Sequence, residues 1–140
     1  MIAHYEAWST LQSTAAMHAL QAHARQERDH ALVSANTPAI VWRRIQDGEV
    51  RAAFVGTGFF LVYDIGPTWC SDAPLFYELM LKRALPGGTF TEAVTDMKAL
   101  ARESGCAGLF TGNGVLRPGL RRLYEREGFR IFNEAYFMEV

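Results

Sequence analysis

The stretch Leu123-Tyr124-Glu125-Arg126-Glu127-Gly128-Phe129, near the C-terminus, carries both a helix and the signals that end it. Its first five residues are acceptable or good helix formers. Gly128 suits the left-handed conformation that closes a helix, and Phe129 supplies the hydrophobic contact beyond the cap. We therefore predict a helix over residues 118–127. The cap accounts for the glycine and the phenylalanine but gives no reason for Tyr124.

The second half of the chain alternates between helical and extended patterns. An amphipathic helix is predicted over residues 91–104, with Thr89 or Thr91 as its cap. Residues 75–85 fit a helix or a strand, because Leu, Met and Lys favour a helix while the Pro86-Gly87-Gly88 that follows suits either. Two further extended segments are predicted, at residues 106–111 and, as one long strand or a hairpin, at residues 129–140.

The N-terminal half begins with a weakly alternating segment, residues 1–8, which predicts a short strand. A region rich in Ala, Gln, Leu and Met then predicts one long helix or two. This region starts at Ser9 or Thr10 and ends at about His30 or Val33.

Beyond Pro38 the pattern becomes extended. Residues 39–46 and 49–56 flank Asp47-Gly48, which is a preferred two-residue hairpin turn, so we predict a hairpin here. The segments predicted after it are a bend, a third strand and a connecting loop, at residues 56–58, 59–65 and 66–74.

Composition narrows the class of protein. With 140 residues, 49% hydrophobic and 21% charged, the chain is expected to be one globular domain over residues 1–140. The net charge of -1 lacks the basic excess that nucleic-acid binding requires. No apolar run approaches the roughly 20 residues that cross a bilayer, and no signal peptide is recognisable, so we expect a cytoplasmic protein. Cys70, Cys106 and the four histidines show no metal-ligand spacing, and no metal site is expected.

The order of elements indicates an α/β sandwich with a mixed sheet. The motif Tyr-x-x-x-Gly-Phe, from Tyr124 to Phe129, resembles the last helix of GCN5-related N-acetyltransferases. The order of elements resembles that fold over essentially the whole chain. The resemblance implies a mixed, mostly antiparallel central sheet flanked by helices on both faces, with residues 75–85 as a strand.

The resemblance also implies a catalytic pair. In that family a tyrosine on the last helix protonates the departing coenzyme A thiolate, which is the role implied for Tyr124. A phenol suits the role of proton donor, since the phenol stays protonated at neutral pH. A glutamate on the strand before the cofactor loop acts as general base in several members, which is the role implied for Glu78. The alternatives are a tyrosine ring packed on the sheet and a glutamate on a solvated face.

A third implication concerns acetyl-CoA, the acyl donor. The family binds its pyrophosphate with backbone amides of a glycine-containing loop, because helix N-termini attract phosphate and glycine permits close approach. The loop here has adjacent glycines after a proline, which departs from the usual spacing, and a simple turn is the alternative. The residues implied to bind the donor are Leu81, Lys82 and Arg83 on the strand, Gly87, Gly88, Thr89 and Phe90 in the loop, and Asn113, which stands farther upstream than usual.

The function implied is transfer of an acetyl group from acetyl-CoA to a primary amine by direct attack in a ternary complex. The acceptor is a small molecule or a protein amine, in a pocket built by the N-terminal helices and residues 66–74, with Trp69, Asp72 and Tyr63 nearby. The chain also resembles short, divergent acetyltransferase-like proteins of tailed phages. The second hypothesis is therefore a non-catalytic structural or interaction protein of the same fold, for example one associated with a virion. Residues 131–140 are also compatible with pairing in a homodimer.

Overall fold

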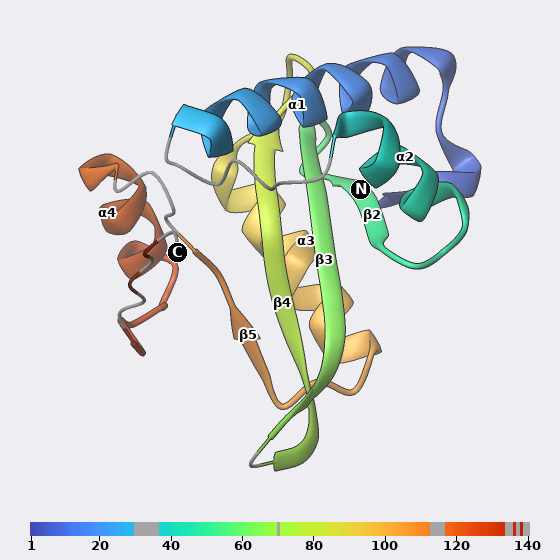
Figure 1. Ribbon diagram of the computed structural model, residues 1–140. Helices are drawn as coiled ribbons and strands as arrows, with labels where there is room; N and C mark the ends of the chain where they lie inside the picture. The colour runs from blue at the N-terminus through green and yellow to red at the C-terminus, as the bar shows by residue number, and fades with distance from the viewer. Residues whose placement is uncertain (30–36, 70, 113–116, 134–135, 137, 139–140) are drawn as a thin grey trace.

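The computed structural model describes residues 1–29, 37–69, 71–112, 117–133, 136 and 138, in which a five-stranded sheet carries helices on both faces (Figure 1). The strands are β1 (Ala3–His4), β2 (Arg51–Val55), β3 (Phe59–Thr68), β4 (Ser71–Arg83) and β5 (Gly108–Phe110). The helices are the 3-10 helix η1 (Tyr5–Ala7), α1 (Thr10–Asp29), α2 (Pro38–Gln46), α3 (Phe90–Glu103) and α4 (Pro118–Arg126). The strand order is β1-β2-β3-β4-β5, antiparallel except for the parallel pair β4–β5. The predicted mixed, mostly antiparallel sheet is confirmed.

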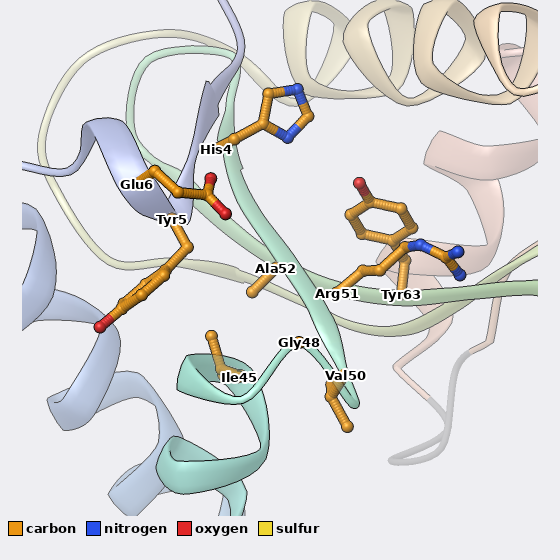
Figure 2. Close-up of a pocket in the computed structure, with 9 residues that line it drawn as sticks. All are labelled: His4, Tyr5, Glu6, Ile45, Gly48, Val50, Arg51, Ala52 and Tyr63. Atoms are coloured by element: carbon orange, nitrogen blue, oxygen red, sulfur yellow. The ribbon is translucent and has the colours of Figure 1, made fainter.

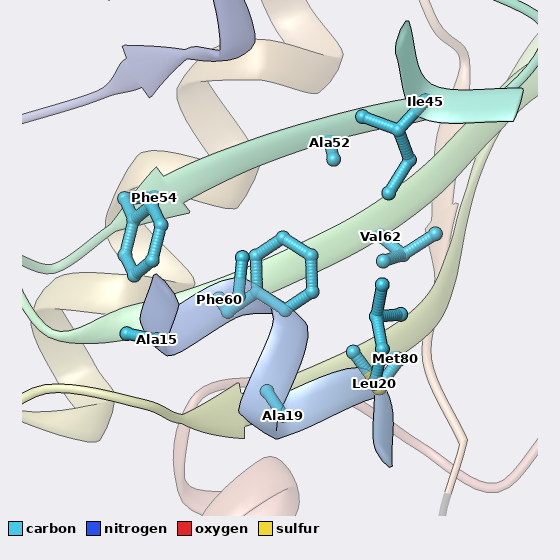
Figure 3. Packing of buried hydrophobic residues seen from close by; sticks show 10 residues of the cluster. Ala15, Ala19, Leu20, Ile45, Ala52, Phe54, Phe60, Val62 and Met80 are labelled. Atoms are coloured by element: carbon cyan, nitrogen blue, oxygen red, sulfur yellow. The ribbon is translucent and has the colours of Figure 1, made fainter. Parts of the chain in front are cut away.

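Two hydrophobic cores lie on opposite faces of the sheet, because successive strand residues point to opposite sides. Phe54 and Phe60 pack with α1 and α2, in a cluster that includes Leu20 (Figure 3). Ala53 and Leu61 belong to the second cluster, with residues of α3. The sheet is therefore covered on both faces where β2 and β3 pair.

Several predicted elements are confirmed. The predicted N-terminal helical region forms one helix, α1, as far as Asp29. Residues 75–85 lie mainly in β4, and α3 begins at a capping box in which the Thr89 side chain accepts from the amide of Glu92. At the end of α4, Gly128 adopts a φ of 93°, as the left-handed cap requires. Among the described residues, no helix is long and apolar enough to cross a membrane.

The predicted hairpin over residues 39–56 is wrong, because residues 38–46 form α2. Thr37 caps this helix by accepting from the amide of Ile40, and Pro38 occupies its first turn. Ile45 is its buried residue. The start signal Thr-Pro thus outweighs the strand propensity of Ile, Val and Trp. The hairpin that does form joins β2 to β3 through Gly56-Thr57-Gly58.

Two other predictions are corrected. Residues 66–68 and 71–74 extend β3 and β4 rather than forming a loop, and Thr68 pairs with Ser71 at the tip of a long hairpin. No strand occurs at residues 129–133, 136 and 138, the described part of the predicted C-terminal strand. The first error arises because a long strand pair tolerates Gly66 and Pro67 next to a register shift.

A β-bulge in β4 reorients the strand next to β5. Val62 pairs with Met80 while its neighbour Tyr63 pairs with Glu78, so Leu79 is an extra residue, and its side chain is 54% exposed. One inserted residue moves the preceding side chains to the opposite face of the sheet. The bulge therefore places Glu78 on the α3 side rather than on the α1 side with Met80.

The sheet opens beside this bulge. β5 pairs with β4 only at Leu75, Phe76 and Tyr77. Residues 78–83 of β4 have no strand beside them on that edge within the described part of the chain. Figure 1 shows β5 leaning away from β4 toward α4. The candidate site lies between this edge of β4 and α4, a region that we call the opening because no strand is paired there in the described chain.

The turn between β4 and α3 packs against the β2–β3 turn. A Cβ on Gly88, whose φ is 68°, would overlap the carbonyl oxygen of Gly56. We expect Gly88→Ala to lower the free energy of unfolding by more than the ~1–2 kcal/mol of left-handed strain alone. Gly105→Ala is the matched control, because Gly105 has the same φ of 68° and open space around it. Urea unfolding of both variants checks this, and equal losses would show that the overlap relaxes freely.

Candidate active site

Glu78 and Tyr124 meet in the opening between β4 and α4. The Tyr124 hydroxyl donates to Oε2 of Glu78 at 3.3 Å, and the amide of Gly112 donates to the same oxygen at 3.2 Å. Oε1 of Glu78 accepts no hydrogen bond from the described residues. One carboxylate oxygen is thus fixed by the protein, while the other has no hydrogen-bond donor among the described residues.

The Tyr124 ring is held between two phenylalanines. It makes edge contacts with Phe90 at the start of α3 and with Phe129, each with ring centroids 5.2 Å apart. The amide of Phe129 donates to the carbonyl oxygen of Tyr124 at 3.0 Å, which closes the helix behind Gly128. Only 7% of Tyr124 is exposed. The glycine and phenylalanine of the cap therefore orient the tyrosine as well as ending the helix.

The electrostatics of the pair suit proton transfer near neutral pH. Burial raises the pKa of Glu78 from 4.5 to about 7, although the Gly112 amide and the Tyr124 hydroxyl both act to lower it. Burial, and then the charge of Glu78, raise the pKa of Tyr124 above its usual 10.0. At neutral pH the phenol is protonated and the carboxyl is close to half ionised. The pair can therefore accept one proton at Glu78 and donate another from Tyr124.

The glycine loop is partly engaged by the protein itself. Arg83 donates from Nη1 to the carbonyl oxygen of Gly87 at 2.9 Å and from Nη2 to that of Gly88 at 3.1 Å. Its guanidinium also lies 4.4 Å from the ring centroid of Phe59. The side chain of Arg83 thus braces the loop, and only its backbone is left for the predicted role along β4.

The start of α3 offers amides and also carries acids. Oε2 of Glu92 accepts from the amide of Thr89 at 2.6 Å, and the Thr91 hydroxyl donates to Glu127 at 2.6 Å. Within the described chain, four amides here have no protein acceptor, those of Gly87, Gly88, Phe90 and Thr91. These amides fit a pyrophosphate group, although the predicted contribution of the Thr89 amide is taken by Glu92.

Solved structures share this architecture. No family model matches the sequence, and no curated protein matches it either. A probable acetyltransferase superposes with a TM-score of 0.68 at 14% identity, covering 100% of this chain and 96% of that one. The ribosomal-protein-alanine N-acetyltransferase of Brucella melitensis biovar Abortus 2308 superposes with a TM-score of 0.63 at 17% identity, covering 100% of this chain and 99% of that one. An acetyltransferase of Trypanosoma brucei superposes with a TM-score of 0.66 at 11% identity, again covering 100% of this chain and 99% of that one.

The chain has the GCN5-related N-acetyltransferase fold. The superposition extends over the whole chain. Glu78 lies on β4 and Tyr124 lies on α4. Leu81, Lys82 and Arg83 lie on the open edge of β4, and the glycine loop follows directly. Asn113 lies outside the described residues.

Two contributors to the site in this acetyltransferase fold were not predicted. The amide of Gly112 fixes Glu78, and the side chain of Thr111 hydrogen-bonds to Tyr124. Both follow the end of β5, which is parallel to β4. Their position in the sequence was the available signal. Residues that directly follow β5 lie level with the residues of β4 that follow the paired segment, among them Glu78.

The predicted acceptor residues are dispersed. Trp69, 97% exposed, and Asp72 lie at the tip of the β3–β4 hairpin, and Asp72 is six residues or about 20 Å along β4 from Glu78. Tyr63 instead lines a pocket of about 240 Å³ at the β2 edge of the sheet, together with Glu6 and Arg51 (Figure 2). The hairpin tip therefore does not contribute to the site at Glu78. No group of three or more metal-ligating side chains occurs among the described residues.

Proposed function

We propose that this protein transfers an acetyl group from acetyl-CoA to a primary amine, by direct attack within a ternary complex. The observation that carries the proposal is the hydrogen bond between Tyr124 and Glu78, 3.3 Å long, at the point where β4 and β5 diverge. A carboxyl whose pKa is raised toward neutral pH and a phenol that stays protonated lie together beside a strand edge that has no partner strand in the described part of the chain. The acetyltransferase names of the structures with this fold support the reaction class.

The donor supplies an activated acetyl thioester. Its pantetheine arm would pair with the backbone of Leu81, Lys82 and Arg83, as an added strand does. The free amides of the Gly87-Gly88 turn and of the first turn of α3 would hold the pyrophosphate. Both sets of groups lead toward Glu78 and Tyr124, which would place the thioester beside them.

Glu78 acts as the general base in this proposal. Its Oε2 is occupied by Gly112 and Tyr124, so Oε1 accepts a proton from the acceptor ammonium and leaves a nucleophilic amine. Tyr124 donates its hydroxyl proton to the departing sulfur. The protonated carboxyl of Glu78, after rotating, returns a proton to the Tyr124 oxygen across their hydrogen bond. As the C–N bond forms and the C–S bond breaks, the attacking nitrogen loses its second proton to water. The pair then regains its starting protonation, the acceptor ammonium has lost two protons, and the thiol and the solvent have each gained one.

Calorimetry with acetyl-CoA tests the proposal first, and saturable binding is expected. Transfer to a panel of primary amines should then show a kcat/KM that rises with pH as Glu78 ionises, with an apparent pKa of about 7. No binding at millimolar acetyl-CoA, with the protein shown to be folded by circular dichroism, would contradict the enzymatic function.

A non-catalytic structural or interaction protein is the second candidate. The observation favouring it is that Arg83 and Glu92 already satisfy part of the glycine loop, and that Gly88 is required by internal packing. A folded protein that neither binds the donor nor transfers the acetyl group would support this candidate.

A further inference from the structure

The pocket of about 240 Å³ at the β2 edge of the sheet forms because β1 is short (Figure 2). β1 pairs with β2 only at Ala3 and His4, and the chain then turns into η1. In the described chain, Arg51 and Ala52 at the start of β2 therefore have no partner strand on this edge. The pocket lies in the space between η1 and β2 that a longer first strand would fill.

Tyr63 is a largely buried side chain whose hydroxyl end reaches the pocket (Figure 2). Only 5% of Tyr63 is exposed, and its ring stacks on Phe76 with centroids 4.7 Å apart. The hydroxyl makes no hydrogen bond with the described residues. Burial raises the pKa of Tyr63 above its usual 10.0, so the phenol stays protonated and can donate. Because the hydroxyl of a buried tyrosine usually has a partner, the acceptor must come from what occupies the pocket.

The pocket carries opposite charges on its two sides. Arg51 is the register partner of Tyr63, which places these two side chains next to each other. Nη1 of Arg51 lies 3.3 Å from Asp64, and the rest of the guanidinium has no acceptor among the described residues. Figure 2 shows Glu6 of η1 across the open space from Tyr63, and Glu6 has no ion-pair partner in the described chain. One side thus offers donors to an anion, and the other offers an acceptor to a cation.

Apolar side chains form the rest of the lining, and the space is small. Ile45, Val50 and Ala52 line the pocket from the α2 side of the sheet. A cavity of about 150 Å³ holds benzene, so a pocket of about 240 Å³ admits on the order of ten non-hydrogen atoms. Sites for drug-sized ligands are larger, at roughly 300–1,000 Å³. Size and polarity together describe a small zwitterion with a short apolar side chain.

We infer that the pocket between η1 and β2 binds a small aliphatic amino acid. The carboxylate of the amino acid accepts from Tyr63 and Arg51, and its ammonium donates to Glu6. Its side chain lies against the apolar lining. The inference is independent of acetyl transfer, because none of the residues lining the pocket belongs to the candidate active site.

NMR titration of the full chain with L-valine and with the two halves of this molecule tests the site. Isobutylamine keeps the ammonium and the apolar body of valine, and isovalerate keeps the carboxylate and the apolar body. L-Valine should bind saturably and shift the amide resonances of Glu6, Arg51 and Tyr63, which line the pocket. Each half should bind about tenfold more weakly than L-valine, because each lacks one of the two charged contacts. L-Alanine and L-leucine are titrated in the same way to bracket the size of the side chain.

Variants assign the two ends of the ligand. Arg51→Gln and Glu6→Gln should each weaken L-valine binding about tenfold. Arg51→Gln should also abolish the preference for L-valine over isobutylamine, and Glu6→Gln the preference over isovalerate. Tyr63→Phe keeps the stacking on Phe76 and should weaken L-valine binding by about three- to tenfold. Glu49→Gln, an exposed carboxylate just before β2, is the matched control and should bind like the wild type.

The outcomes separate this site from the candidate active site. L-Valine is itself a primary amine, so Glu78→Gln is included and should leave its affinity unchanged. Thermal unfolding of each variant checks that the fold is retained. The inference is overturned if none of the three amino acids shifts the pocket resonances, or if the shifts are confined to the surroundings of Glu78. Folded Arg51→Gln and Glu6→Gln variants that bind L-valine as Glu49→Gln does would overturn it as well.

Discussion

Glu78→Gln should reduce acetyl transfer by about 10²–10⁴-fold, the usual contribution of a general base. Glutamine keeps the size of the side chain and an oxygen that can accept from Gly112 and Tyr124, so the geometry of the opening is retained. It cannot take a proton from the acceptor. Steady-state kinetics with a primary amine measure the effect. Glu125→Gln, on the exposed side of α4, is the control and should leave the rate unchanged.

The same substitution should raise stability at alkaline pH. Because the pKa of Glu78 is raised from 4.5 to about 7, the folded protein binds more protons than the unfolded chain between these values. Stability therefore falls as the pH rises through this interval, by up to about 3 kcal/mol above pH 7. Glutamine removes this loss, so the variant should exceed the wild type at pH 8 and match it at pH 4. Urea unfolding at both pH values measures this, and a variant less stable than the wild type at pH 8 would contradict the buried charge.

Tyr124→Phe should lower kcat by about 10²–10⁴-fold with little change in donor affinity. The phenyl ring preserves the contacts with Phe90 and Phe129, so the helix stays in place. The loss of the hydroxyl removes the proton donor for the thiolate. It also removes a hydrogen bond that favours ionised Glu78, so the pKa of Glu78 should rise. The acidic limb of kcat/KM is then expected at higher pH than in the wild type.

This shift of the pH profile separates catalysis from packing. Tyr77→Phe is the matched control, because Tyr77 stacks on Phe110 on the neighbouring part of the sheet, with centroids 5.4 Å apart. It should change neither kcat nor the acidic limb. A Tyr124→Phe variant with unchanged turnover would leave Tyr124 as a packing residue. Lower turnover with an unmoved limb would show that the hydrogen bond to Glu78 does not form.

Helix propensity and capping residues predicted the helices whose ends are fixed by nearby residues. The α4 helix and its Gly128 cap, and the α3 helix with its capping residue Thr89, follow from helix propensity and capping alone. The hairpin prediction failed because Asp47-Gly48 is a turn signal that also occurs after a helix, while Thr37-Pro38 is a stronger start signal.

The site was only partly accessible from the sequence. Glu78 and Tyr124 were named by their resemblance to a family pattern, but the contact between them depends on the bulge at Leu79, which reorients Glu78. A bulge is a property of strand pairing and has no dependable signature in one strand alone.

In the described part of the chain, the edge of β4 at residues 78–83 has no partner strand, and this bears on solubility. A strand edge with free backbone groups is a template for another chain, and apolar residues such as Leu79 and Leu81 strengthen that tendency. Lys82 and Arg83 at its end are the kind of charged residues that discourage such pairing. An occupant of the opening covers the same edge. If the acyl donor pairs with β4 as we propose, ligand occupancy and resistance to aggregation are linked, and the form without ligand is the one exposed to edge-to-edge association.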